Sequence, residues 1–144
     1  MHHAGQKVLI QRKHGLAAVV FSVSVSAARA VSPCDGVDRS LTVEHRSAWA
    51  PEIAKQLSVS SVDVLQSFRV DGWNIIYVDT HQSDEVFIFY ARDPLTSHYI
   101  TSWSGAAASN EEETIKDWTL KNAPNIPLKL ASCFAWHVTK DRDK

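Results

Sequence analysis

The densest group of chemically active side chains in this 144-residue sequence is Asp79-x-His81-x-x-Asp84-Glu85, with three carboxylates and one imidazole within seven residues. Carboxylates and imidazole can transfer protons or bind a metal ion. One loop rarely supplies a complete metal coordination shell, and the sequence shows no second cluster of metal-ligating residues. We therefore expect this segment to bind a partner through its charge, with no metal and no cofactor.

Motifs that would identify an enzyme are missing from the sequence. It contains no Gly-x-Ser-x-Gly elbow, no His-Glu-x-x-His motif, no glycine-rich phosphate loop and no paired-cysteine motif. The enzymatic alternative is a small hydrolase that uses His81 or His98 together with Asp79. We predict a non-enzymatic protein without catalytic residues.

Aromatic residues offer a second means of binding. All five tryptophans follow residue 30, and a small core cannot enclose every aromatic ring. Trp49 recurs with Ile53 at helical spacing, which indicates a core position. Trp73, Tyr99 and Trp103 are expected to be partly exposed, and Trp73 and Tyr99 are candidate anchors at the rim of an interface.

The N-terminal segment has the layout of a secretory signal peptide. A basic head precedes the apolar run 16–27, and Ala28-Arg29-Ala30 provides small residues for cleavage after Ala30. An apolar run of this length is too short to span ~30 Å of hydrocarbon. We therefore expect residues 1–30 to be removed and residues 31–144 to form one globular domain, most simply in a bacterial periplasm.

Removal of residues 1–30 changes the charge balance. Residues 31–144 retain 11 of the 15 Lys and Arg residues and all 16 Asp and Glu residues, which gives a formal net charge of −5. Nucleic acids and anionic membrane surfaces attract basic proteins, so neither is an expected partner. A cationic partner is compatible with this charge.

Two cysteines lie near the two ends of the predicted domain. In an oxidising compartment, an even pair is most simply one disulfide, here between Cys34 and Cys133. A catalytic thiol or a zinc site lacks the neighbouring residues that either would need.

The elements that would position these residues are a helix, a meander of strands and further helices. Asp71-Gly72 predicts a type I′ hairpin turn, because both residues tolerate positive φ. That turn would pair Val70 with Trp73 and, further along, Val64 with Asp79. Two more strands are expected at 85–91 and 98–104. The first is apolar on both faces, so it is either a central strand or one whose outer face meets another surface.

The first helix is expected within 40–57, with Ser47 or a neighbour as its cap and Pro51 in its first turn. Ser109 and Glu112 predict a capping box for a second helix. Segment 128–138 could be helix or strand, and we favour a helix. The predicted fold is α+β: a four-stranded antiparallel meander flanked by an N-terminal helix and one or two C-terminal helices.

A signal peptide, an α+β domain of this size, one disulfide and the acidic loop 80–85 with aromatic neighbours resemble the small periplasmic inhibitor and immunity proteins of Gram-negative bacteria. The resemblance concerns the overall plan and implies a protein partner: a cell-wall hydrolase or toxin whose active site is occluded by an acidic or polar loop. The binding residues would be Asp79, His81, Asp84, Glu85, Trp73 and Tyr99. An envelope sensor of a small ligand is a further alternative, which a closed apolar cavity beneath the sheet would suggest.

Overall fold

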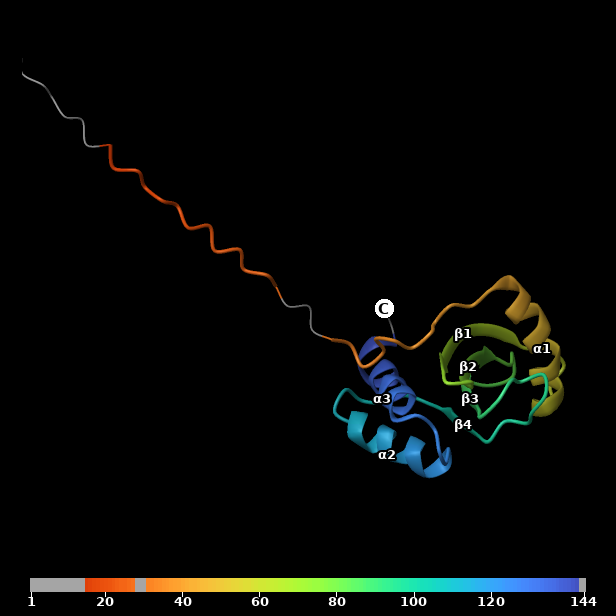
Figure 1. Cartoon of the computed structure of the whole chain (residues 1–144). Helices are drawn as coiled ribbons and strands as arrows, with labels where there is room; N and C mark the ends of the chain where they lie inside the picture. Colours follow the sequence, from red (N-terminus) through yellow and green to blue (C-terminus); the bar gives the residue numbers. More distant parts are fainter. Residues whose placement is uncertain (1–14, 28–30, 143–144) are drawn as a thin grey trace, which may run out of the picture.

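The computed structural model describes residues 15–27 and 31–142, and its helices and strands, which lie between Val43 and Asp141, form an α+β fold. Residues 15–27 contain no helix or strand, and they extend away from the domain (Figure 1). The basic head and the cleavage position of the predicted signal peptide lie outside the described residues. No described helix is long and apolar enough to cross a membrane.

A four-stranded antiparallel sheet forms the centre of the domain. Its strands β1 (Asp63–Val70), β2 (Trp73–Asp79), β3 (Val86–Tyr90) and β4 (Thr101–Ser104) lie side by side in chain order. Asp71 and Gly72 form the turn between β1 and β2 with φ values of 51° and 83°, the positive values that a two-residue hairpin turn requires. The predicted meander is confirmed.

The predicted register of the hairpin holds for only part of its length. Val70 pairs with Trp73 and Phe68 with Ile75, as expected, but Val64 pairs with Val78 and not with Asp79. A bulge at Leu65 causes the difference, because it places one additional residue in β1. Asp79 therefore faces Asp63 across the hairpin.

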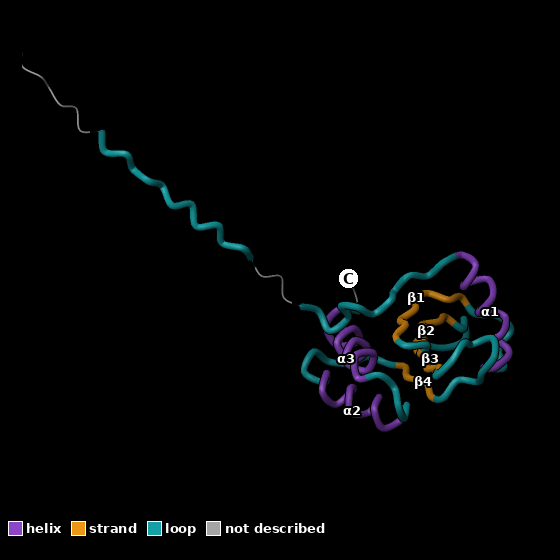
Figure 2. Tube along the Cα trace, viewed as in Figure 1, coloured by secondary structure: helices purple, strands orange, loops and turns teal. Residues whose placement is uncertain are grey.

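Helices cover both faces of the sheet (Figures 1 and 2). Helix α1 (Val43–Leu57) packs on one face through Trp49 and Ile53, against a cluster that includes Ile76 and Ile88. Helices α2 (Glu112–Asn122) and α3 (Leu128–Trp136) contribute to the core on the other face. Strand β3 has apolar side chains on both faces because it lies inside the sheet with a helical layer on each side, as its sequence predicted.

Both predicted helix starts are wrong in detail. Helix α1 begins earlier than expected, and Thr42 caps it by accepting a hydrogen bond from the backbone N–H of His45 at 3.1 Å. Pro51 therefore lies inside the helix and not in its first turn. Helix α2 lacks the predicted Ser109 capping box; the carboxylate of Glu111 accepts a hydrogen bond from the N–H of Ala108 instead.

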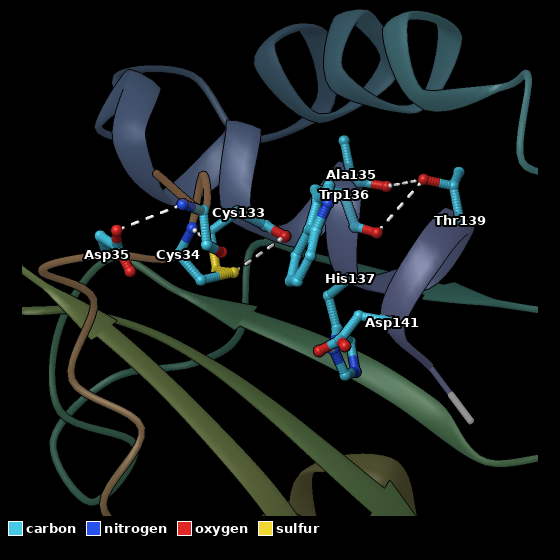
Figure 3. Close-up of a disulfide and its surroundings, with 9 residues drawn as sticks. Cys34, Asp35, Cys133, Ala135, Trp136, His137, Thr139 and Asp141 are labelled. Carbon is cyan, nitrogen blue, oxygen red and sulfur yellow. Dashed lines mark hydrogen bonds and ion pairs between the residues drawn. A yellow bond between two sulfur atoms is a disulfide. The ribbon is translucent and has the colours of Figure 1, made fainter. Parts of the chain in front are cut away.

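The C-terminal segment is helical, as favoured from the sequence. Helix α3 continues directly into a π-helical turn, η1 (His137–Asp141). The predicted disulfide is confirmed: Cys34 and Cys133 are bonded, with their Cα atoms 4.5 Å apart. The bond joins the segment that precedes α1 to helix α3 (Figure 3).

Candidate functional site

The β2–β3 loop, residues 80–85, brings together four of the six predicted binding residues at one end of the sheet. Asp79 ends β2, His81 and Asp84 are exposed in the loop, and Glu85 precedes β3. We call this end of the molecule the loop end. The hairpin turn at Asp71-Gly72 lies at the other end of β2.

His81 connects the loop to both strands of the hairpin. Its Nε2 lies 3.0 Å from a carboxylate oxygen of Asp63, and its Nδ1 lies 3.5 Å from Asp79. Asp79 also accepts a hydrogen bond from the backbone N–H of His81 at 2.8 Å, and His81 has a positive φ of 60°. The short Asp side chain thus fixes a local turn that holds the imidazole between two carboxylates.

Asp63, Asp79 and His81 each offer a possible metal-ligand atom, and these atoms lie within 4.8 Å of one another. Oxygen and imidazole ligands of this kind suit several divalent ions. The contacts of His81 with the two carboxylates nevertheless account for this geometry without a metal ion. Asp63 was not among the predicted site residues, because the bulge at Leu65 brings it opposite Asp79.

A cleft of about 580 Å³ adjoins the loop, and we call it the loop-end cleft. Three segments of the chain line it: the β2–β3 loop, the connection from β4 to α2, and the C-terminal turn. Its lining residues are Asp84, Glu85, Gly105, Ala106, Ala107, Val138, Thr139, Lys140 and Arg142. The cleft therefore combines two carboxylates with two basic side chains.

The basic side chains of the cleft already have partners. Lys140 forms an ion pair with Glu112, and Arg142 donates hydrogen bonds to the carbonyl oxygen of Gly105 and to the hydroxyl of Tyr77. Among the described residues, Asp84 and Glu85 have no ion pair. These two carboxylates consequently give the cleft an acidic surface that a partner can contact.

Three aromatic rings from adjacent strands lie beneath Arg142. Tyr77 of β2 pairs with Phe87 of β3, and Phe87 pairs with Trp103 of β4. The Tyr77 and Phe87 rings are stacked with centroids 4.2 Å apart, and the Phe87 and Trp103 centroids are 6.1 Å apart. We call these three residues the aromatic ladder.

His137 is buried next to the ladder, with 2% of its surface exposed. Its ring meets Phe68 edge-on at 4.9 Å between centroids and lies 6.0 Å from Phe87. Burial lowers the pKa of His137, and the positive charges of Arg39 and Arg142 lower it further. Asp141, whose carboxylate lies 3.6 Å from Nδ1 and appears beside His137 in Figure 3, opposes this shift only in part.

The two predicted aromatic anchors lie away from the loop end. Trp73 begins β2 and Asp79 ends it, a separation of about 20 Å at ~3.3 Å per residue. Trp73 adjoins a separate pocket of about 460 Å³ at the hairpin turn, which His45, Trp49 and Asp93 also line. Tyr99 precedes β4, and its N–H donates to Gln56 of α1. Both side chains are partly exposed, as predicted, but they are not adjacent to the charged loop.

His98 is also remote from Asp79 and His81. It lies in the connection between β3 and β4. In this connection, the backbone N–H of Ile100 donates to the carbonyl oxygen of Phe89, near the end of β3 that is farther from the charged loop. Its Nδ1 lies 2.8 Å from the backbone oxygen of Tyr99. The structure therefore does not assemble His98 and Asp79 into one site.

Sequence reasoning did not identify the aromatic ladder or Arg142 as part of the site. The pairing of Tyr77 with Phe87 and Trp103 requires the register across three strands, and only the first hairpin has a turn signal that sets its register. Comparison of the chain with protein-family models, curated proteins and solved structures gave no significant match.

Proposed function

We propose that this protein is exported to the periplasm and blocks a cell-wall-degrading enzyme or toxin, as an inhibitor or immunity protein, by covering the enzyme's active site with the loop end. The observation that carries the proposal is the pair Asp84 and Glu85. These two carboxylates border a cleft and lack an ion pair among the described residues.

The energetics of such an interface favour a basic partner. Unpaired carboxylates at the rim attract a positively charged surface and accelerate its association. Partly buried aromatic side chains next to them supply apolar contact area, which carries most of the binding free energy in protein interfaces. The loop end offers both, in the exposed Asp84 and the partly exposed rings of Tyr77 and Trp103.

Two further observations support export. The Cys34–Cys133 disulfide is of the kind that persists in an oxidising compartment. The segment 16–27 is apolar in sequence yet exposed and without regular structure, which suits a leader that is not part of the folded domain.

The test is capture and inhibition. The oxidised protein, immobilised, is exposed to periplasmic extract and to a panel of lysozyme-type hydrolases and toxins, and each captured enzyme is assayed on purified peptidoglycan. We expect inhibition by the native protein and at least tenfold weaker inhibition by Asp84→Asn/Glu85→Gln.

The matched control is Glu44→Gln/Asp117→Asn, which removes the same charge from helices α1 and α2. It should inhibit as well as the native protein. Equal inhibition by the native protein and by the loop variant would refute the assignment of the loop end, and failure to inhibit any captured enzyme would refute the proposed function.

A further inference from the structure

The aromatic ladder and the loop-end cleft together have the features of a cation-binding site. The guanidinium carbon of Arg142 lies 5.8, 5.7 and 5.7 Å from the ring centroids of Tyr77, Phe87 and Trp103. Cations within about 6 Å of an aromatic centroid are attracted by the negative face of the ring. One guanidinium therefore interacts with three rings from three strands.

The polar contacts of Arg142 suit a guanidinium in particular. Its Nη1 donates to the carbonyl oxygen of Gly105, and its Nη2 donates to the Tyr77 hydroxyl at 3.3 Å. A planar guanidinium can stack on rings and donate at its edge at the same time, which an ammonium group cannot do. The residues around Arg142 thus offer a guanidinium both aromatic faces and two hydrogen-bond acceptors.

The ladder is preorganised by the sheet. Its residues are neighbours in the hydrogen-bonded register. Phe87 is fully buried, with Tyr77 and Trp103 on the two adjacent strands and the ring of Phe134 of α3 packed against it. Arg142, by contrast, follows the η1 turn and is not part of the sheet. The rings are therefore held in place by the strands, whereas the cation above them comes from a segment outside the sheet.

The acidic residues of the cleft lie on the approach to this site. Asp84 and Glu85 line the same cavity as Arg142, yet Arg142 makes no ion pair with either of them. Their charge is available for an incoming cation, and Glu85 directly precedes β3, which carries Phe87. Arg142 lines the cleft and covers the three rings, which are not among the lining residues themselves. An arginine that entered the cleft would meet the carboxylates, and it would reach the rings by displacing Arg142.

We propose that the loop-end cleft is a binding site for a guanidinium group, presented as an arginine side chain of the partner, and that Arg142 occupies the aromatic part of this site in the free protein. This inference rests on the proposed function and names the chemistry that the loop end recognises. Arg142 competes with an external guanidinium for the rings. The apparent affinity for the external group is therefore its intrinsic affinity multiplied by the fraction of molecules in which Arg142 has left the rings.

The inference can be tested without the partner, using L-argininamide as the probe and L-lysinamide as the comparison. We would titrate the isotope-labelled, oxidised native protein and Arg142→Gln, and follow the assigned indole N–H signal of Trp103. Arg142→Gln should bind L-argininamide at least fivefold more tightly than the native protein does. Both proteins should prefer it to L-lysinamide, and Arg142→Gln/Glu85→Gln should lose most of the gain.

The native protein provides a second readout that does not depend on the folding of a variant. The Nε–H signal of Arg142, shifted by the ring currents of the ladder, should move toward its value in free arginine as L-argininamide is added. If that signal stays in place and Trp103 does not respond in either protein, there is no guanidinium site.

These outcomes are distinct from a failure of the proposed function. Binding of L-argininamide without capture of any hydrolase would refute only the proposed function. Capture of a hydrolase by a protein that fails this titration would refute only the guanidinium site.

Discussion

The hydroxyl of Tyr90 donates a hydrogen bond to Oε1 of Gln56 across 2.8 Å, and this bond joins the central strand β3 to helix α1. The same Gln56 donates from Nε2 to the backbone oxygens of Pro94 and Ser97, at 3.2 and 2.9 Å. Burial raises the pKa of the Tyr90 hydroxyl, and the charge of Glu52 adds to this effect. One amide side chain therefore holds the β3–β4 connection against the helix.

Replacement of Gln56 should destabilise the domain more than replacement of Tyr90. Gln56→Ala removes the partner of several partly buried polar groups, which should lower the free energy of unfolding by about 2–3 kcal/mol, whereas Tyr90→Phe should cost about 1 kcal/mol. Urea unfolding measures both, with Gln82→Ala in the exposed loop as the control. Changes no larger than that of the control would contradict this role for Gln56.

Reduction of the disulfide should also destabilise the domain. The bond joins positions 99 residues apart, and closing a loop of that length restricts the unfolded chain by about 4–5 kcal/mol on the chain-entropy view. We expect the urea midpoint of the native protein to fall on addition of a reductant. Cys34→Ala/Cys133→Ala should start at the lower midpoint and be insensitive to the reductant. If reductant lowers both midpoints equally, the bond is not the cause.

Protonation of His137 should make the fold sensitive to mild acid. Its folded-state pKa is lowered by burial and by the nearby charges of Arg39 and Arg142, so the unfolded chain takes up a proton first as the pH falls. The stabilisation is therefore fully present above the unfolded pKa of about 6.5 and is lost below it, with a slope of up to about 1.4 kcal/mol per pH unit.

The measurement is the free energy of unfolding between pH 7.5 and pH 5.5. His137→Phe preserves an aromatic ring beside Phe68 and removes the titrating group, so its profile should be flatter than that of the native protein in this range. Parallel profiles would show that another group causes the loss of stability.

Local sequence signals predicted the parts of the fold that depend on nearby residues. Asp71-Gly72 specified the turn because both residues tolerate positive φ. The apolar sequence of β3 indicated a strand covered on both faces, and the structure places it inside the sheet with a core cluster on each side. The pairing of Cys34 with Cys133 followed from there being only two cysteines.

Features that depend on distant contacts were not accessible in this way. The bulge at Leu65 has no glycine or proline to signal it, and it moved Asp63 into the site. The start of α1 was misplaced because Ser47 and Thr42 are both acceptable caps. The binding residues were grouped by residue type, yet the length of β2 separates Trp73 from Asp79.

The proposed role of the loop end is tested most directly by the association rate of a captured hydrolase. We would measure this rate at low and high salt for the native protein, Asp84→Asn/Glu85→Gln and the control Glu44→Gln/Asp117→Asn. Added salt screens charges beyond a Debye length of about 10 Å at 0.1 M. The native protein and the control should associate equally fast at low salt and slow down steeply with salt. The loop variant should associate at least tenfold more slowly at low salt and depend much less on it. Equal rates and equal salt dependence for all three proteins would contradict the account.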